Sequence, residues 1–444
     1  MRLTDALRLQ PGATLSFTGA GGKTSALRRL AAEASRSRPV LMTTTTHLGL
    51  EQVGIAEGHM VVESVARIGA ARDALWRASS LLVTGPAIES EGKWGAPPDD
   101  VLRALLSVAI DAGAALIVEA DGARGRVLKA PAEHEPLVPK FTNIVVPVVG
   151  ASGIGQPLDE AWVHRPERLA AVANLRQGEA ISPDAVVRLL RSAEGGLKGV
   201  PAGAEVRVLV NQVDAGAMES VEQVVRGALE DERIQAVAVA DLAADSPVLA
   251  VRGRTAGVIL AAGGSKRYGR PKLLEVWRGE PIIRHVLRAA EASALAPLVV
   301  VLGDHGDAVA GAVSDLPGVR LVNPHWAEGQ SRSLQVGLHA VESISEAAVF
   351  LLGDMPLIKP ELISRLVERH AATLAPIVLP WAEGRRGNPV LFDRATFDSL
   401  HEITGDTGGR AIFDRFEAEH VEWEAEAFFD LDAPDDLAWL DGQA

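Results

Sequence analysis

Short apolar runs recur along the chain, and stretches of helical period separate many of them. The runs expected to form strands are residues 13–18, 39–42, 115–118, 206–210, 255–259, 297–303, 319–322 and 347–352. Residues 280–293 repeat apolar side chains at helical spacing, which predicts a helix with one buried face. Strands that alternate with helices favour a mostly parallel, doubly wound α/β fold.

The length of the chain, 444 residues, exceeds what one hydrophobic core usually organises. Residues 245–254, DSPVLAVRGR, combine proline, glycine and arginine without a helical period. We therefore expect a domain boundary there, with residues 1–250 forming one α/β domain and residues 251–444 a second.

The charge balance limits the partners. With 44 basic against 58 acidic residues the net charge is −14, which disfavours binding to nucleic acid or to an anionic membrane surface. A phosphate ligand must then be held by local cations. The absence of cysteine excludes disulfides and thiolate metal sites, and no apolar run approaches the ~20 residues of a membrane span. These features predict a soluble, cytoplasmic protein.

Residues 260–272, LAAGGSKRYGRPK, follow a predicted strand and mix glycines with cations. Glycine lets the backbone approach an anion with its amide groups, and fixed cations such as Lys266, Arg267 and Lys272 neutralise the anion's charge. We predict a phosphate-binding loop here, and a solvated strand-to-helix loop is the alternative.

Acidic residues mark the same half. Asp354 follows the apolar run at 347–352, and open α/β sheets bind ligands at the carboxyl ends of their strands. Asp430 and Asp432 alternate in sequence, so both can face one site if the segment is extended.

The N-terminal half carries Gly21, Gly22, Lys23 and Thr24 between a predicted strand and a predicted helix, in the order of a P-loop. Such a loop cradles phosphates, its lysine reaches the outer phosphates and its hydroxyl binds Mg²⁺. Phe17 stands where the usual first glycine would be, so the match is partial and a plain tight turn is the alternative. Asp121, after another apolar run, is a candidate Mg²⁺ ligand of the Walker B type.

The C-terminal half resembles the MobA/MocA-like nucleotidyltransferases, which attach a nucleotide to molybdopterin. The resemblance rests on LAAGGSKRYGRPK and on four later motifs in the family's order: GDMP at 353–356, GNPVLF at 387–392, GDTGGR at 405–410 and DLDAPDDL at 430–437. It implies a Rossmann-like nucleotidyltransferase domain that transfers CMP from CTP to molybdopterin and releases pyrophosphate, for the maturation of molybdenum hydroxylases.

The resemblance also implies roles for individual residues. Arg267, Lys272 and Asp354 would be catalytic, and Asp354 and Asp432 would bind Mg²⁺. The residues expected to bind nucleotide or pterin are Leu260, Ala261, Ala262, Gly263, Gly264, Ser265, Ser331, Ser333, Asn388, Asp406 and Arg410. CTP-using members tend to carry Ala-Ala-Gly where GTP-using members carry an additional glycine, so Ala262 predicts a preference for CTP.

The N-terminal half resembles the YqeC family, accessory proteins of selenium-dependent molybdenum hydroxylases. The shared stretches are GAGGKT at 19–24, TTTTH at 43–47 and EADGARGRVLKAPAEHEP at 119–136. ATP or GTP is the expected ligand of this half, and a molybdenum hydroxylase apoenzyme or its insertion chaperone is a candidate partner.

Three other functions stay open from the sequence. The transferase domain could use GTP, or it could transfer a nucleotide to a sugar phosphate, because the same loop and acid serve that chemistry. Alternatively, the chain could be a cofactor-insertion chaperone whose N-terminal domain hydrolyses nucleotide.

Overall fold

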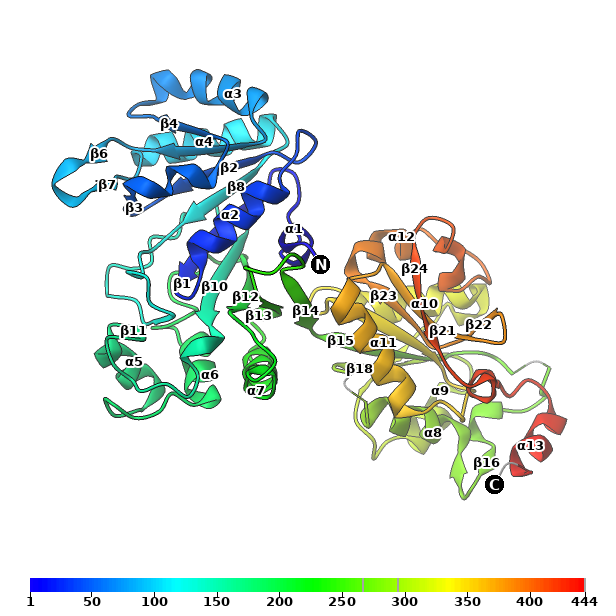
Figure 1. Ribbon diagram of the computed structural model, residues 1–444. Helices are drawn as coiled ribbons and strands as arrows, with labels where there is room; N and C mark the ends of the chain where they lie inside the picture. The colour runs from blue at the N-terminus through cyan, green and yellow to red at the C-terminus, as the bar shows by residue number, and fades with distance from the viewer. Residues whose placement is uncertain (266, 294, 443–444) are drawn as a thin grey trace. The chain divides into compact units, whose positions relative to one another are not determined.

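A computed structural model describes residues 1–265, 267–293 and 295–442. The chain divides into two compact units, Met1–Arg252 and Gly253–Ala444 (Figure 1). Each unit is an α/β structure with a largely parallel sheet, so the predicted fold class is confirmed. Lys266, one of the predicted loop cations, lies outside the described residues.

The sheet of the first unit has, among the described residues, the strand order β14-β13-β12-β10-β1-β8-β2-β5-β4. The strands are β1 Thr14–Gly19, β2 Val40–Thr44, β4 Gly58–Val61, β5 Ser80–Thr84, β8 Ala115–Glu119, β10 Ile144–Gly150, β12 Glu205–Asn211, β13 Ile234–Ala240 and β14 Val248–Gly253. Pairing from β13 to β4 is parallel. The chain adds strands on one side of β1 and then on the other, so β1 lies at a topological switch point, where such sheets bind ligands.

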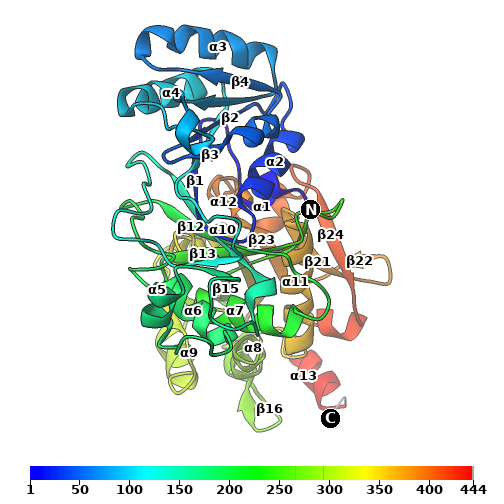
Figure 2. The ribbon, with the colours of Figure 1, turned by 60° about the vertical axis from the view of Figure 1, so that its left-hand side comes forward.

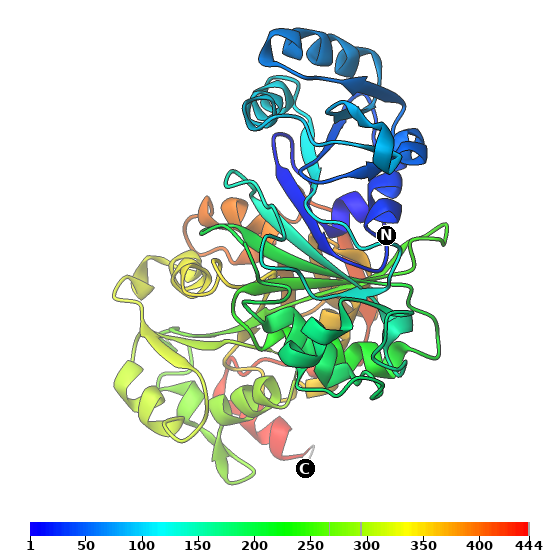
Figure 3. The ribbon, with the colours of Figure 1, turned by 90° about the vertical axis from the view of Figure 1, so that its left-hand side faces the viewer.

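Helices cover the first sheet in two groups. The helices are α1 Leu3–Ala6, α2 Lys23–Glu33, α3 Ile68–Arg77, α4 Asp99–Asp111, α5 Pro166–Ala173, α6 Pro183–Arg191 and α7 Met218–Leu229. α3 and α4 lie side by side and share a core with β2, β5 and β8 (Figure 3). α5, α6 and α7 form a second core with β10, β12 and β13 (Figure 2). Short strands complete the unit: β3 Leu48–Gly49, β6 Ala87–Ile88, β7 Lys93–Trp94, β9 Leu128–Lys129 and β11 Val163–His164.

The second unit has a mixed sheet in the order β19-β18-β15-β20-β23-β21-β22, with β24 paired to β21. The strands are β15 Thr255–Ala261, β18 Leu298–Leu302, β19 Val319–Val322, β20 Ala347–Leu352, β21 Ile377–Ala382, β22 Arg385–Arg386, β23 Val390–Asp393 and β24 Ala418–Glu422. β15, β18, β19 and β20 pair in parallel, whereas β23 is antiparallel to β20 and β21. β15 lies between β18 and β20, again at a switch point.

Alternate residues of β15 pack on opposite faces of this sheet. Ile259 faces a core formed with α8 Ile282–Glu291, α9 Gly306–Ala312 and α11 Pro360–Thr373. Val258 faces a core formed with α10 Gln330–His339 and α12 Phe397–His401. A strand buried on both faces reads as a continuous apolar run, as the sequence does here. A hairpin of β16 Val276–Trp277 and β17 Glu280–Pro281 packs with α13 Pro434–Asp441.

Among residues 1–265, 267–293 and 295–442, no helix combines the length and the apolar character that crossing a membrane requires.

Candidate functional site

The glycine-rich loop leaves the carboxyl end of β15 at the switch point of the second sheet. Ser265, at φ +47°, accepts a hydrogen bond from the Gly269 amide through its carbonyl and one from the Lys272 amide, at 3.3 Å, through its hydroxyl. Gly264 must lack a side chain, because a Cβ there would lie 2.8 Å from the ring of Trp326. The loop is therefore folded on itself so that Lys272 points back toward the strand ends.

Lys272 contacts two of the predicted acids. Its Nζ lies 2.5 Å from Asp354 Oδ2 and 3.3 Å from Asp432 Oδ1. Burial alone would lower the pKa of Lys272, but the ion pairs and hydrogen bonds with the two carboxylates outweigh burial, so that its pKa is raised. Asp354 and Asp432, which follow Lys272 by 82 and 160 positions in the sequence, thus lie together around its ammonium group.

Three carboxylates face this lysine, because Asp430 joins the pair. Burial, and then the charges of Asp432 and Asp354, raise the pKa of Asp430. Among the residues that the structure describes, the exposed Arg267 is a second cation here, and its Nη1 lies 3.9 Å from Asp432 Oδ2. Counting the described residues alone, three carboxylates stand against two cations here, and carboxylates are oxygen donors of the type that Mg²⁺ prefers.

This donor set fits Mg²⁺ in one particular way. In the described part of the chain, no three His, Asp or Glu side chains are arranged to hold a metal ion by themselves. Mg²⁺ is usually bound through one or two carboxylates together with substrate phosphates, rather than in an all-protein cage. Asp354 and Asp432 supply such a partial set.

The predicted residues line one cavity of about 750 Å³, within the range of small-molecule sites. They are Leu260, Ala261, Ala262, Gly263, Gly264, Ser265, Arg267, Lys272, Ser333, Asp354, Asp406, Arg410 and Asp432. Sequence reasoning missed Tyr268, Trp326, Glu328 and Gln330, which also line it. Trp326 is needed to explain Gly264, but no local pattern in the sequence connects the two.

Two predicted binding residues do not line the cavity. Ser331 is buried, and its hydroxyl donates to the carbonyl of Gly405 at 2.8 Å. Asn388, which precedes a cis peptide bond to Pro389, is also absent from the cavity wall. Ser331 instead joins the start of α10 to the loop that carries Asp406 and Arg410.

The N-terminal loop joins β1 to α2 and is closely packed. A Cβ on Gly21 would lie 2.2 Å from the Gly150 amide nitrogen, and one on Gly22 would lie 2.2 Å from Asn211 Nδ2. The amides of Gly19 and Gly21 donate to Asp121 Oδ2 and to the carbonyl of Arg126. These amides are therefore engaged within the protein, and the groups left to meet a ligand are those of the first turn of α2.

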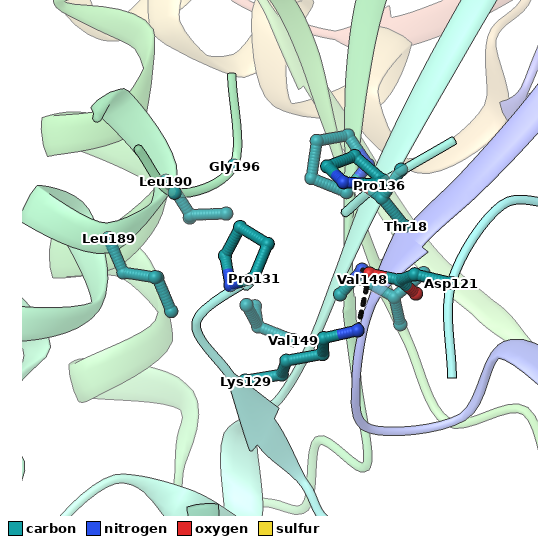
Figure 4. Close-up of a pocket in the computed structure, with 13 residues that line it drawn as sticks. Thr18, Asp121, Lys129, Pro131, Pro136, Val148, Val149, Leu189, Leu190 and Gly196 are labelled. Carbon is teal, nitrogen blue, oxygen red and sulfur yellow. Dashed lines mark hydrogen bonds and ion pairs between the residues drawn. The ribbon is translucent and has the colours of Figure 1, made fainter. Parts of the chain in front are cut away.

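A buried chain of alternating charges runs away from this loop. Lys23 Nζ lies 3.0 Å from Asp121 Oδ1. Lys129 Nζ lies 3.0 Å from Asp121 Oδ2, and Figure 4 shows this second ion pair. Lys129 also pairs with Glu135 at 2.8 Å, and Glu135 pairs with Arg165 at 2.7 Å. Beside Asp121 and Lys129 is a cavity of about 20 Å³, room for a water molecule but not for a nucleotide.

The side chains predicted to bind Mg²⁺ in this unit fit that role poorly. Both oxygens of Asp121 already contact lysine ammonium groups, and Asp121 is 1% exposed. The Thr24 hydroxyl accepts a hydrogen bond from Gln52 Nε2 at 2.9 Å. Glu119, also nearby, is buried, and burial raises its pKa to about 7. Here cations surround the carboxylate, the reverse of the arrangement around Asp354.

In the second unit, a glycine-rich, lysine-bearing loop lies at the switch point of a largely parallel sheet, beside acids at the neighbouring strand end. This is the arrangement of a nucleotidyltransferase active site. Residues 257–421 match the family model of the MobA-like NTP transferase domain, and residues 15–167 match that of the YqeC protein. YqeC of Escherichia coli K12 is 30% identical over 245 residues, which cover 54% of this chain and 90% of that protein. The chain belongs to the YqeC family, and its C-terminal unit is a MobA-like nucleotidyltransferase domain.

Other relatives match a smaller share of the chain. The bifunctional protein GlmU of Rhodospirillum rubrum is 34% identical over 128 residues, and the match spans only 28% of each chain. Among solved structures, Rv0371c of Mycobacterium tuberculosis H37Rv is 27% identical, with a TM-score of 0.39, over 43% of this chain and 98% of that one.

Proposed function

We propose that the C-terminal unit is a molybdenum cofactor cytidylyltransferase, which transfers CMP from CTP to molybdopterin and releases pyrophosphate. The observation that supports this most is the convergence of the glycine-rich loop, Lys272 and Asp354 on one cavity of about 750 Å³. That cavity is large enough for a nucleotide, and its polar groups stand at the strand ends where a triphosphate would lie.

The reaction needs few protein groups. The terminal phosphate of the pterin attacks the α-phosphorus of CTP, one P–O bond forms, and the bond to pyrophosphate breaks. A phosphate dianion is already nucleophilic, so positioning and neutralisation of charge carry the catalysis. Lys272 and Arg267 would exchange their carboxylate partners for the phosphates and stabilise the leaving pyrophosphate. Mg²⁺ held by Asp354 and Asp432 would supply further neutralisation.

The acceptor would bind on the side of Arg410 and Asp406. A guanidinium is a planar fork of donors that suits a phosphate, and Arg410 lines the cavity. The Ser331–Gly405 hydrogen bond, at 2.8 Å, ties this loop to the first turn of α10. Binding of the acceptor would therefore change the affinity for the nucleotide, and the reverse, through this contact.

Ala262 supports CTP as the donor. It is 5% exposed and lines the cavity. A Cβ on Gly303 would lie 2.7 Å from the Ala262 methyl group, so the methyl group is fixed against its neighbouring strand. A fixed methyl group narrows the space for a base and favours a pyrimidine over a purine.

A second candidate acceptor is a sugar phosphate, because the same glycine-rich loop and strand-end acid serve that chemistry. The test is pyrophosphate release from CTP, GTP, ATP or UTP, each with molybdopterin, with a hexosamine phosphate, or with no acceptor. The proposal expects release that depends on both CTP and molybdopterin. Release with GTP that is as fast as with CTP, or faster, rejects the cytidylyl assignment, and release with the sugar phosphate alone rejects the pterin.

A further inference from the structure

A cluster of cations surrounds the start of α2 in the first unit. We call Lys23, Arg124, Arg126, Lys129 and Arg165 the α2 cation cluster. Three of them share the carboxylates of Asp121 and Glu135. Arg124 and Arg126 are exposed, and within the described ranges neither has an ion-pair partner within 4 Å. The cluster thus holds five cations, and with Glu119 counted as ionised it holds three carboxylates, Asp121, Glu135 and Glu119.

The two exposed arginines are placed beside the loop by the backbone. The carbonyl of Arg126 accepts a hydrogen bond from the Gly21 amide at 3.1 Å, so the backbone at Arg126 lies against the glycine turn, and Arg124 is two residues away. The pKa of His164 shows the effect of these positive charges. Burial and then the charges of Arg165, Lys129 and Arg124 lower the pKa of His164 to about 4. Arg165, Lys129 and Arg124 are therefore close enough to act on one point.

The backbone adds to this positive field. α2 has 11 residues, and its first turn begins at Lys23, directly after the closely packed Gly22. The amide groups at a helix N-terminus carry partial positive charge and favour anions. In a chain with a net charge of −14, such a local excess of cations costs repulsion unless an anion offsets it.

We propose that the first unit binds a phosphate-bearing anion, without a divalent metal ion, at the α2 cation cluster. Nucleoside triphosphates and pyrophosphate share the chemistry that the cluster would recognise. The site is distinct from the nucleotidyltransferase cavity and does not depend on the function proposed for that cavity.

The contrast between the two units carries the metal-free part of the proposal. Around Lys272, the described part of the chain brings together three carboxylates, Asp430 included, and two cations, so a divalent ion would be attracted. Around Asp121, two ammonium groups and an amide saturate one carboxylate. A divalent ion there would have to displace buried lysines and would add to an existing excess of positive charge.

The ligand would take Lys23 away from Asp121. Asp121 would keep Lys129 at 3.0 Å and the Gly19 amide at 3.1 Å, so no buried charge would be left without a partner. Arg124 and Arg126, which are exposed, would close over the ligand from the solvent side. The buried lysines thus act as the counter-ions that a metal supplies in other phosphate sites.

The test is isothermal titration of the full chain with ATP, GTP, pyrophosphate or inorganic phosphate, in EDTA and in Mg²⁺. We expect ATP, GTP or pyrophosphate to bind in EDTA within about twofold of the affinity in Mg²⁺. Equal affinity for pyrophosphate and the nucleotides means that the site recognises the phosphates alone. Tighter binding of one nucleotide means that the site also recognises its base. The titration is repeated on Lys272→Met, and any change in heat with that variant assigns that part of the binding to the transferase cavity.

Variants localise the binding. Lys23→Met and Arg126→Ala should each weaken it about tenfold or more, since each removes a charge-assisted hydrogen bond. Arg126 is exposed, so its loss cannot unfold the core. The matched controls Lys140→Met and Arg103→Ala, also exposed, should change affinity less than twofold. Binding that requires Mg²⁺, binding that is indifferent to Lys23 and Arg126, or no binding of any probe overturns the proposal.

Discussion

Replacement of Lys272 by methionine separates a catalytic ammonium from a merely structural one. Methionine preserves most of the side-chain volume but removes the charge that lies 2.5 Å from Asp354 Oδ2 and 3.3 Å from Asp432 Oδ1. Asp354, Asp430 and Asp432 are then left without their nearest cation. If Lys272 neutralises the leaving pyrophosphate, kcat should fall about 10²–10³-fold, which is the usual cost of losing one preorganised donor to a developing anion.

The same variant should bind metal better before nucleotide arrives. Two unit charges about 4 Å apart repel by about 1 kcal/mol in water, so an ammonium opposes a divalent ion by about 2 kcal/mol. Its removal should tighten the binding of Mn²⁺, in the absence of CTP, by about thirtyfold. Electron paramagnetic resonance of free Mn²⁺ measures this affinity, and stopped-flow pyrophosphate release measures kcat.

Lys359→Met is the matched control. Lys359 pairs with Glu424 at 2.6 Å on the surface of the same unit, and both side chains are more than half exposed. Neither kcat nor the affinity for Mn²⁺ should change in that variant. A Lys272→Met protein with kcat within threefold of wild type and unchanged affinity for Mn²⁺ would show that Lys272 only stabilises the fold.

Three further predictions concern the base, the domain boundary and pH. Ala262→Gly should erode the preference for CTP over GTP only in part, because one methyl group is worth about 1–3 kcal/mol of discrimination, and the ratio of kcat/KM values checks it. A fragment that begins near Val251 should fold and retain nucleotidyl transfer, which thermal unfolding and pyrophosphate release will show; an insoluble fragment argues for a shared core. Glu119→Gln should flatten the pH dependence of unfolding. The pKa of Glu119 is raised from 4.5 to about 7, so its contribution to stability is present below pH 4.5 and lost as pH rises through about 7. The variant should therefore gain, relative to wild type, up to about 3 kcal/mol at pH 8 but little at pH 4, as measured by urea unfolding.

The sequence predicted the parallel layers well because buried strands leave an apolar run that needs no partner to be recognised. The run at 347–352 coincides with β20, and the helix expected over 280–293 forms as α8 Ile282–Glu291. Short polar motifs also identified the wall of the large cavity, since loops at strand ends carry the side chains that face ligands. Arg267, Lys272 and Asp354 all line it.

What the sequence could not predict depends on contacts between distant segments. Ser331 is a small polar residue of the kind that often faces a ligand, yet its hydroxyl is buried and bonded to the carbonyl of Gly405, 74 positions away. The charge around Asp121 is set in part by Lys129, which reaches it from the short strand β9, and no local pattern connects β9 to the P-loop-like turn. A sequence motif can identify a carboxylate as a candidate ligand. Whether that carboxylate suits a metal ion or an ammonium group depends on the neighbouring charges.

The most direct test of the central claim is to identify the product. The full chain, incubated with CTP, Mg²⁺ and molybdopterin, should yield a molybdopterin cytosine dinucleotide and an equal amount of pyrophosphate, detected by mass spectrometry of the extracted pterin. Asp354→Ala, which removes an acid at a strand end rather than a core side chain, should remain folded and form no product. A guanine dinucleotide formed from GTP at an equal rate, a nucleotidylated sugar phosphate with an unmodified pterin, or full activity of a folded Asp354→Ala protein would contradict the account.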